Sequence, residues 1–232
     1  MAEAAKQELA RRSDALTDLA LTLPIFLVYH LGVVFLPVRN AADPVSGRLA
    51  AFAAESPLGY TGLTIALGVA IVVVLVAFGR KHALDKKRFL LVALEGGLYA
   101  LIMRTAGSYV VGELSLGAAD VGTTAGNAVM ALGAGFYEEV LFRVVIFGGG
   151  VVFLKAMMGK NLKTLLVILA WGLVEAAVFS GWHHVGAMAE AFELRAFVFR
   201  AVCGVVLTAV FALRGFAPAV WTHAIYDLWV ML

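Results

Sequence analysis

The chain has 232 residues, of which 62% are hydrophobic and only 15% are charged. Soluble domains carry about 25% charged residues, and one domain of this length could not bury so much apolar surface, so a water-soluble protein is excluded. The net charge of +2 does not indicate a function, because in membrane proteins the distribution of charge among the loops matters more than the sum. The single cysteine, Cys203, excludes an internal disulfide. The composition predicts a polytopic membrane protein.

The apolar segments predict an all-α transmembrane bundle. Residues 1–17 are polar, have high helix propensity and lack the apolar core of a secretory signal, so we expect a surface or interfacial helix there. Apolar segments that approach the length of a membrane-spanning helix follow at residues 18–38, 60–79, 89–111, 125–147, 163–185, 195–213 and 216–232. No strand pattern of period two occurs. We therefore expect about seven or eight membrane helices, divided into an N-terminal group (18–124) and a C-terminal core (125–232).

The connecting residues carry signals for helix ends and for orientation. Three glycines at 148–150 are expected to end or loosen the fourth apolar helix. The sequence RGFAP predicts a tight turn, with Pro218 in the first turn of a new helix. Lys and Arg gather at 80–88 and 155–163, so the positive-inside rule places these loops and the N-terminus in the cytoplasm.

Ionisable residues inside the apolar segments gather in three stretches, the first of which is GFYEEVLFR. A charge at mid-bilayer costs at least about 2.5–3.5 kcal/mol, so such groups face the bundle interior, pair or take part in chemistry. Glu139 and Arg143 are four residues apart and share a helix face, whereas Glu138 lies about 100° around the helix and has no evident cation. Glu138 is either a spare acid beside a structural ion pair or a general base.

The second stretch, EAAVFSGWHH, places Glu175, Phe179 and His183 along one helix stripe. His183 and His184 point in different directions, so at most one of them joins a given site. Their position beside Trp182 is also typical of residues at the membrane interface.

The third stretch, WTHAIYD, places His223 and Asp227 four residues apart, so that both can converge on one point. A histidine held by a carboxylate of its own helix is the alternative interpretation. Taken together, the three stretches lie on three separate helices and supply Glu, His, His and Asp. They predict one shared polar site.

Three motifs in this order resemble those of the CAAX protease and bacteriocin-processing (CPBP, or Abi) family of intramembrane glutamic endopeptidases. The motifs are Glu138-Glu139-x-x-x-Arg143, Phe179-x-x-x-His183 and His223-x-x-x-Asp227. The resemblance covers about residues 130–232, including the run RGFAPAVWTHAIYD, whereas residues 1–129 are similar only in being hydrophobic and helical.

The resemblance implies an endopeptidase that hydrolyses a peptide bond near the terminus of a membrane-associated protein or peptide. It implies that Glu138 and His183 activate a water molecule and that His223 and Asp227 stabilise the oxyanion. Asp227 departs from the asparagine that is most frequent at this position. An aspartate donates a hydrogen bond only when protonated, so orienting His223 or sharing a proton is its alternative role.

The resemblance also implies that Glu139 and Arg143 form a structural ion pair, and Phe179 and Glu175 are candidates to line the cavity. The residues themselves favour a general base without a covalent intermediate, because no serine elbow is present and Cys203 is far from the motifs. Two histidines and two carboxylates could instead hold zinc, but the HExxH spacing is absent. We expect no cofactor, with zinc as the minority alternative.

Two other functions stay open, namely a catalytically silent scaffold or immunity protein and a proton-coupled transporter, since buried Glu and His also relay protons. The expected partners are the lipid bilayer and a membrane-associated substrate, without nucleic acid, and the oligomeric state stays open.

The composition rich in Ala, Gly and Val suggests a bacterial cytoplasmic membrane, where a peptide leader or sorting tail is a more natural substrate than a prenylated protein. Outside the motifs, His30 and Glu95 are also intramembrane, and we expect a helix–helix hydrogen bond for Glu95.

Overall fold

The computed structural model describes residues 2–36, 38–45, 55–77, 85–112, 123–186 and 189–232. Within these residues the chain is helical and contains no strand, which confirms the all-α fold class. The helices are α1 (Ala2–Phe35), α3 (Pro57–Ala77), α4 (Lys86–Val111), α5 (Thr124–Gly133), η2 (Ala134–Gly148), α6 (Gly149–Met158), α7 (Leu162–Trp182), α8 (Leu194–Arg214) and α9 (Phe216–Met231).

The described residues form a polytopic membrane protein. Six helical stretches are long and apolar enough to cross a bilayer, and they agree with the first six predicted segments to within a few residues, apart from a longer fourth helix. The seventh predicted segment is α9, a helix of only 16 residues. Most of the loop predicted at 80–88 lies outside the described residues, so the predicted orientation in the membrane stays a prediction.

The helix expected at residues 1–17 is not a separate element, because α1 continues from Ala2 into the first apolar segment without a break. Asp18 ties this helix to the C-terminal half. Its Oδ2 accepts hydrogen bonds from the backbone N–H groups of Phe216 at 2.6 Å and Ala217 at 3.3 Å. A carboxylate at this position satisfies unpaired amides of α9 and complements the positive end of its dipole.

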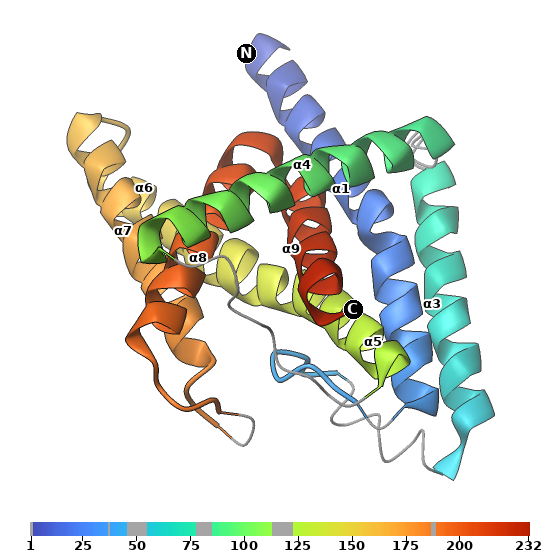
Figure 1. The fold of residues 1–232 in the computed structure, drawn as a ribbon. Coiled ribbons are helices and arrows are strands. Elements are labelled where there is room, and N and C mark those ends of the chain that lie inside the picture. The colour runs from blue at the N-terminus through green and yellow to red at the C-terminus, as the bar shows by residue number, and fades with distance from the viewer. Residues whose placement is uncertain (1, 37, 46–54, 78–84, 113–122, 187–188) are drawn as a thin grey trace.

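The fourth predicted helix is longer than expected and does not end at 148–150, where it changes from the π-helical η2 to the α-helical α6. Helices α5, η2 and α6 form one continuous rod, which runs diagonally through Figure 1. One of these glycines, Gly150, allows a close helix contact. A Cβ atom on Gly150 would collide with the indole ring of Trp171, whose Nε1 donates to the carbonyl of Ile146 at 3.2 Å.

The middle of this rod, η2, has the wider turn of a π-helix, a conformation that is rare and often found at functional sites. Glu138, Glu139 and Arg143 all lie on η2 and are buried.

The predicted turn between the last two helices is confirmed. Helix α8 ends at Arg214, and α9 begins at Phe216 with Pro218 in its first turn. Gly215 between them has φ of 106°, a conformation that residues with a Cβ atom rarely adopt.

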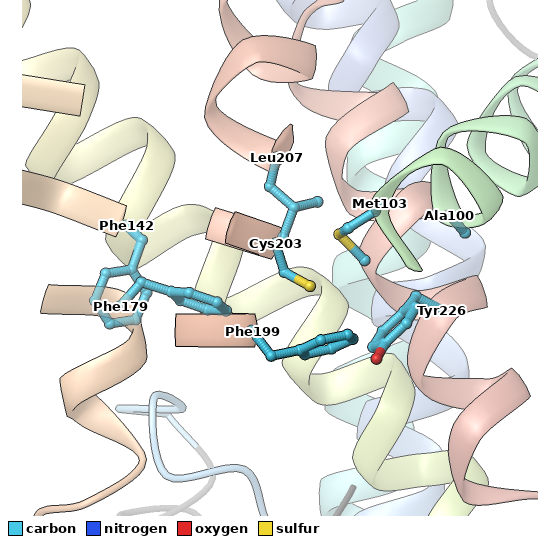
Figure 2. Close-up of a cluster of buried hydrophobic side chains, with 8 residues drawn as sticks. All are labelled: Ala100, Met103, Phe142, Phe179, Phe199, Cys203, Leu207 and Tyr226. Atoms are coloured by element: carbon cyan, nitrogen blue, oxygen red, sulfur yellow. The ribbon is translucent and has the colours of Figure 1, made fainter. Parts of the chain in front are cut away.

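Helix α9 packs against α1, α4, α5, α8 and η2, so it lies at the centre of the bundle (Figure 1). A cluster of buried side chains joins α9 to α4, η2, α7 and α8 (Figure 2). The cluster consists of Ala100, Met103, Phe142, Phe179, Phe199, Cys203, Leu207 and Tyr226. Cys203 is thus a packing residue. The cluster fixes the positions of the helices that carry the ionisable residues.

The contact between α4 and α9 depends on one of two adjacent glycines. A Cβ atom on Gly96 would lie 2.8 Å from Cβ and 2.9 Å from the carbonyl carbon of Trp221, whereas one on Gly97 would meet nothing within 4 Å. We expect Gly96→Ala to lower the free energy of unfolding by about 1–3 kcal/mol, because α9 must move. Gly97→Ala should be neutral or stabilise the helix by about 0.5–1 kcal/mol. Unfolding by SDS in mixed micelles measures both; equal effects would contradict this packing.

Candidate active site

The structure brings the three sequence motifs together at one buried point. Glu138 lies on η2, His183 directly follows the last residue of α7, and His223 lies near the middle of α9. Oε2 of Glu138 is 4.0 Å from Nε2 of His183 and 3.9 Å from Nε2 of His223. These distances are too long for direct hydrogen bonds, and each is a separation that one bridging water can span.

Glu138 is buried, and its two oxygen atoms have different surroundings. Oε1 accepts a hydrogen bond from Nδ2 of Asn40 at 2.9 Å. Oε2 faces the two imidazole rings and has no hydrogen-bond partner among the described residues. A buried polar atom without a partner is rare in a native protein and calls for an explanation.

The two imidazole rings are held by different groups. Nδ1 of His183 lies 3.1 Å from the backbone carbonyl of Phe179, which can only accept, so Nδ1 carries the proton. In the neutral ring, Nε2 of His183 is then an acceptor directed at Glu138. Nδ1 of His223 instead contacts Oε1 of Glu139 at 2.8 Å.

Asp227 lies on the other side of His223, with Oδ2 3.5 Å from Nε2. The second ring nitrogen of His223 is therefore flanked by the carboxylates of Asp227 and Glu138. The sequence analysis placed Glu139 only in a structural ion pair and missed its contact with His223, because sequence spacing within one helix says nothing about partners on another.

Behind Glu139 lies a fully buried group of charges. Nε of Arg143 is 3.3 Å from Oε2 of Glu139, as the spacing of four predicted, and its Nη1 is 3.4 Å from Oε1 of Glu175. Thr208 donates to the other oxygen of Glu175 at 2.6 Å. Glu175 thus belongs to this ion network and does not contact Glu138. The sequence analysis had named it as a candidate to line the cavity.

Phe179 packs between Arg143 of this network and the two histidines. Its ring covers the Arg143 guanidinium at 4.4 Å and makes edge contacts with the rings of His183 and His223. An aromatic face stabilises a buried cation and excludes water from it. Each residue of the predicted stripe therefore has a contact in this region: Glu175 pairs with Arg143, Phe179 packs on Arg143, and His183 faces Glu138.

Asn40 of the N-terminal half also reaches the site, and the sequence analysis did not single it out. Asn40, in the segment after α1, contacts Glu138, and its backbone N–H donates to the hydroxyl of Tyr29 at 3.1 Å. His30 lies between the hydroxyls of Tyr60 at 2.8 Å and Tyr137 at 2.5 Å. The sequence signal was faint, because an uncharged asparagine in a polar loop does not stand out.

Two other ionisable residues lie outside the site. His184 turns away from Glu138, and its Nδ1 contacts the carbonyl of Glu190 at 3.2 Å, so only one of the adjacent histidines joins the site, as predicted. Glu95 on α4 pairs with Arg214 of α8 at 2.5 Å, which is the expected helix–helix contact.

The described residues contain no group of three or more His, Cys, Asp and Glu side chains placed to hold a metal ion. Glu138, His183, His223 and Asp227 lie close together, and the distances between their side-chain atoms are 3.5–4.0 Å.

The fold and the site define a multi-pass membrane protein with a buried carboxylate–histidine centre on three helices. A family model described as type II CAAX prenyl endopeptidase Rce1-like matches residues 120–229, just under half of the chain. This part of the chain is similar to that family of membrane proteases, and the match confirms the resemblance inferred from the motifs. No curated protein and no solved structure matches the chain.

Proposed function

We propose that this protein is an intramembrane endopeptidase in which Glu138 and His183 activate a water molecule for attack on a peptide bond. The observation that carries the proposal is Oε2 of Glu138, which is buried, has no hydrogen-bond partner among the described residues and lies about 4 Å from both imidazole Nε2 atoms. A water molecule between these atoms would hydrogen-bond to the base and to His183. Peptide hydrolysis needs a nucleophilic water, a base and donors for the oxyanion.

In the proposed reaction, Glu138 accepts a proton from the water as its oxygen attacks the scissile carbonyl carbon. His183 assists, because its Nδ1 donates to the Phe179 carbonyl and its Nε2 is left as an acceptor facing the water. The proton then passes to the leaving amine, so the reaction forms a carboxylate and an amine without a covalent enzyme intermediate.

His223 is the proposed donor to the oxyanion. Glu139 and Glu175 carry two negative charges, and Arg143 neutralises only one of them, so a protonated His223 makes this buried group neutral. Protonated His223 uses Nδ1–H for Glu139 and presents Nε2–H to the reacting carbonyl. Asp227, 3.5 Å from Nε2, would stabilise the imidazolium and keep its ring in place.

We propose that the reaction requires no metal. We expect cleavage by the purified protein to be unchanged after prolonged dialysis against a chelator and after addition of Zn²⁺ at low micromolar concentration. Loss of activity on chelation that Zn²⁺ restores would contradict this part of the proposal, because Glu138 and the histidines would then serve as ligands.

The proposed substrate is the terminal region of a membrane-associated protein or peptide, approached within the bilayer. The composition rich in Ala, Gly and Val favours a bacterial cytoplasmic membrane as the site of action, with a peptide leader or sorting tail as substrate.

The proposal is tested by comparing the protein termini of cells that carry the wild type or Glu138→Ala at equal expression. Termini that are present with the wild type and lost with the variant are expected, and they identify the substrate and the cleaved bond together. An identical set of termini, with both proteins folded in the membrane, would favour a scaffold or a proton-coupled transporter instead.

A further inference from the structure

We propose that Asn40, which lies outside the family-matched residues 120–229, is a positioning residue for the Glu138 carboxylate. The inference rests on the proposed function and deepens it. Asn40 is buried, and its Nδ2 donates to Oε1 of Glu138 at 2.9 Å across 98 residues of sequence. The side chain itself is held in place. Its Oδ1 accepts from the backbone N–H of Ala42 at 2.8 Å, so the amide NH2 group must be the part that faces Glu138.

The segment that carries Asn40 is anchored by α1. The Asn40 backbone N–H donates to the hydroxyl of Tyr29, and this hydroxyl donates to Oδ2 of Asp43 at 2.8 Å. Tyr29 is fully buried and packs edge to face against the ring of Tyr137, the residue before Glu138. The N-terminal half of the chain therefore builds a rigid support for this one hydrogen bond.

As a consequence, the two oxygen atoms of Glu138 have different roles. Asn40 occupies Oε1 with a donor, so Oε2 is the atom left to take a proton, and it is the atom that faces His183 and His223. A hydrogen bond from an amide also stabilises the ionised carboxylate while leaving its second oxygen free. Without Asn40, the carboxyl group could rotate and Oε1 would be buried without a partner.

The test measures single-turnover cleavage of the peptide found by the comparison of termini, using the full-length protein in proteoliposomes. We expect Asn40→Ala to slow cleavage about ten- to a hundredfold with little change in KM, because a hydrogen bond to a charged group is lost. The matched control is Asn127→Ala. Asn127 is another buried asparagine, which donates to the carbonyl of Met231 at 3.0 Å, and its removal should leave the rate within about twofold of the wild type.

Asn40→Asp distinguishes positioning from a general loss of structure. The new carboxyl group keeps the shape and the acceptor for Ala42, but it can donate to Glu138 only when it holds a proton. We expect this variant to be slow at neutral pH and to recover toward acid pH, a profile that the wild type and Asn127→Ala do not show. The other ionisable groups around Glu138, namely His183, His223 and its neighbours Glu139 and Asp227, are common to all variants.

Wild-type rates and pH profiles in both Asn40 variants, with Glu138→Gln inactive, would overturn the positioning role and leave the proposed function standing. If Asn40→Ala does not fold, the test rests on Asn40→Asp. A pH profile of cleavage by Asn40→Asp that equals the wild-type profile would then overturn the positioning role. Equal cleavage by the wild type and Glu138→Gln would overturn the proposed function itself.

Discussion

Glu138→Gln should slow peptide cleavage by the purified protein about 10²- to 10⁴-fold, the range in which general bases contribute. Glutamine keeps the size of the side chain, and its carbonyl oxygen can still accept from Asn40. The amide nitrogen would then replace Oε2, the atom that faces the two histidines, and an amide cannot take a proton from water. The fold should be retained, so the loss should appear in the single-turnover rate at saturating substrate.

The matched control for this variant is Glu95→Gln. Glu95 is also an intramembrane glutamate with a hydrogen-bonded partner, but that partner is Arg214 at the end of α8, away from the motifs. Its replacement should leave the cleavage rate near that of the wild type. Full activity of Glu138→Gln, or an equal loss in both variants, would exclude Glu138 as the base.

Arg143→Met should be the most destabilising single substitution in the motifs. Arg143 is fully buried between Glu139 and Glu175, and its Nη2 also donates to the carbonyl of Gly204 on α8 at 3.3 Å. Removing it leaves Glu175 without a cation and Glu139 with His223 alone in the bundle interior, where loss of one partner costs about 3–5 kcal/mol. Methionine preserves much of the apolar volume of the arginine side chain, so the change in the free energy of unfolding reflects the loss of the positive charge.

The matched control is Arg214→Met, which removes the same kind of pair from an exposed position. The side chains of Arg214 and Glu95 are 54% and 25% exposed, so neither group is enclosed by the bundle when its partner is removed, and we expect a smaller loss than for Arg143→Met. Unfolding by SDS in mixed micelles measures both variants on the same scale. Comparable losses would mean that the buried network does not hold η2, α7 and α8 together.

The fold was largely predictable because lipid imposes a strong rule. Backbone groups in a bilayer must be satisfied within the segment, so long apolar stretches become helices. The predicted segments match the helices within a few residues, apart from the longer fourth helix and the earlier start of α1. The glycines at 148–150 were misread because glycine has two uses. It ends helices in water, but in membranes it also allows close helix contact, and here Trp171 occupies the space beside Gly150.

The sequence predicted which charged residues form the site, but it did not predict which of their atoms contact one another. Buried charges are expensive, so Glu138, His183, His223 and Asp227 stood out in apolar segments. Which atom faces which depends on how the helices pack, and spacing along one helix could not show that Glu139 reaches His223. Asn40 carries no charge and lies in a connecting segment, so no pattern in the sequence pointed to it.

The central claim is that Glu138 and His183 act together on one water molecule, and a double variant tests it most directly. Single-turnover cleavage would be measured for Glu138→Gln, His183→Ala and the two combined, because residues that act as a unit are strongly non-additive. We expect the double variant to be about as slow as the slower single variant. A loss equal to the product of the two single losses would mean that the residues act independently, and would contradict a shared water.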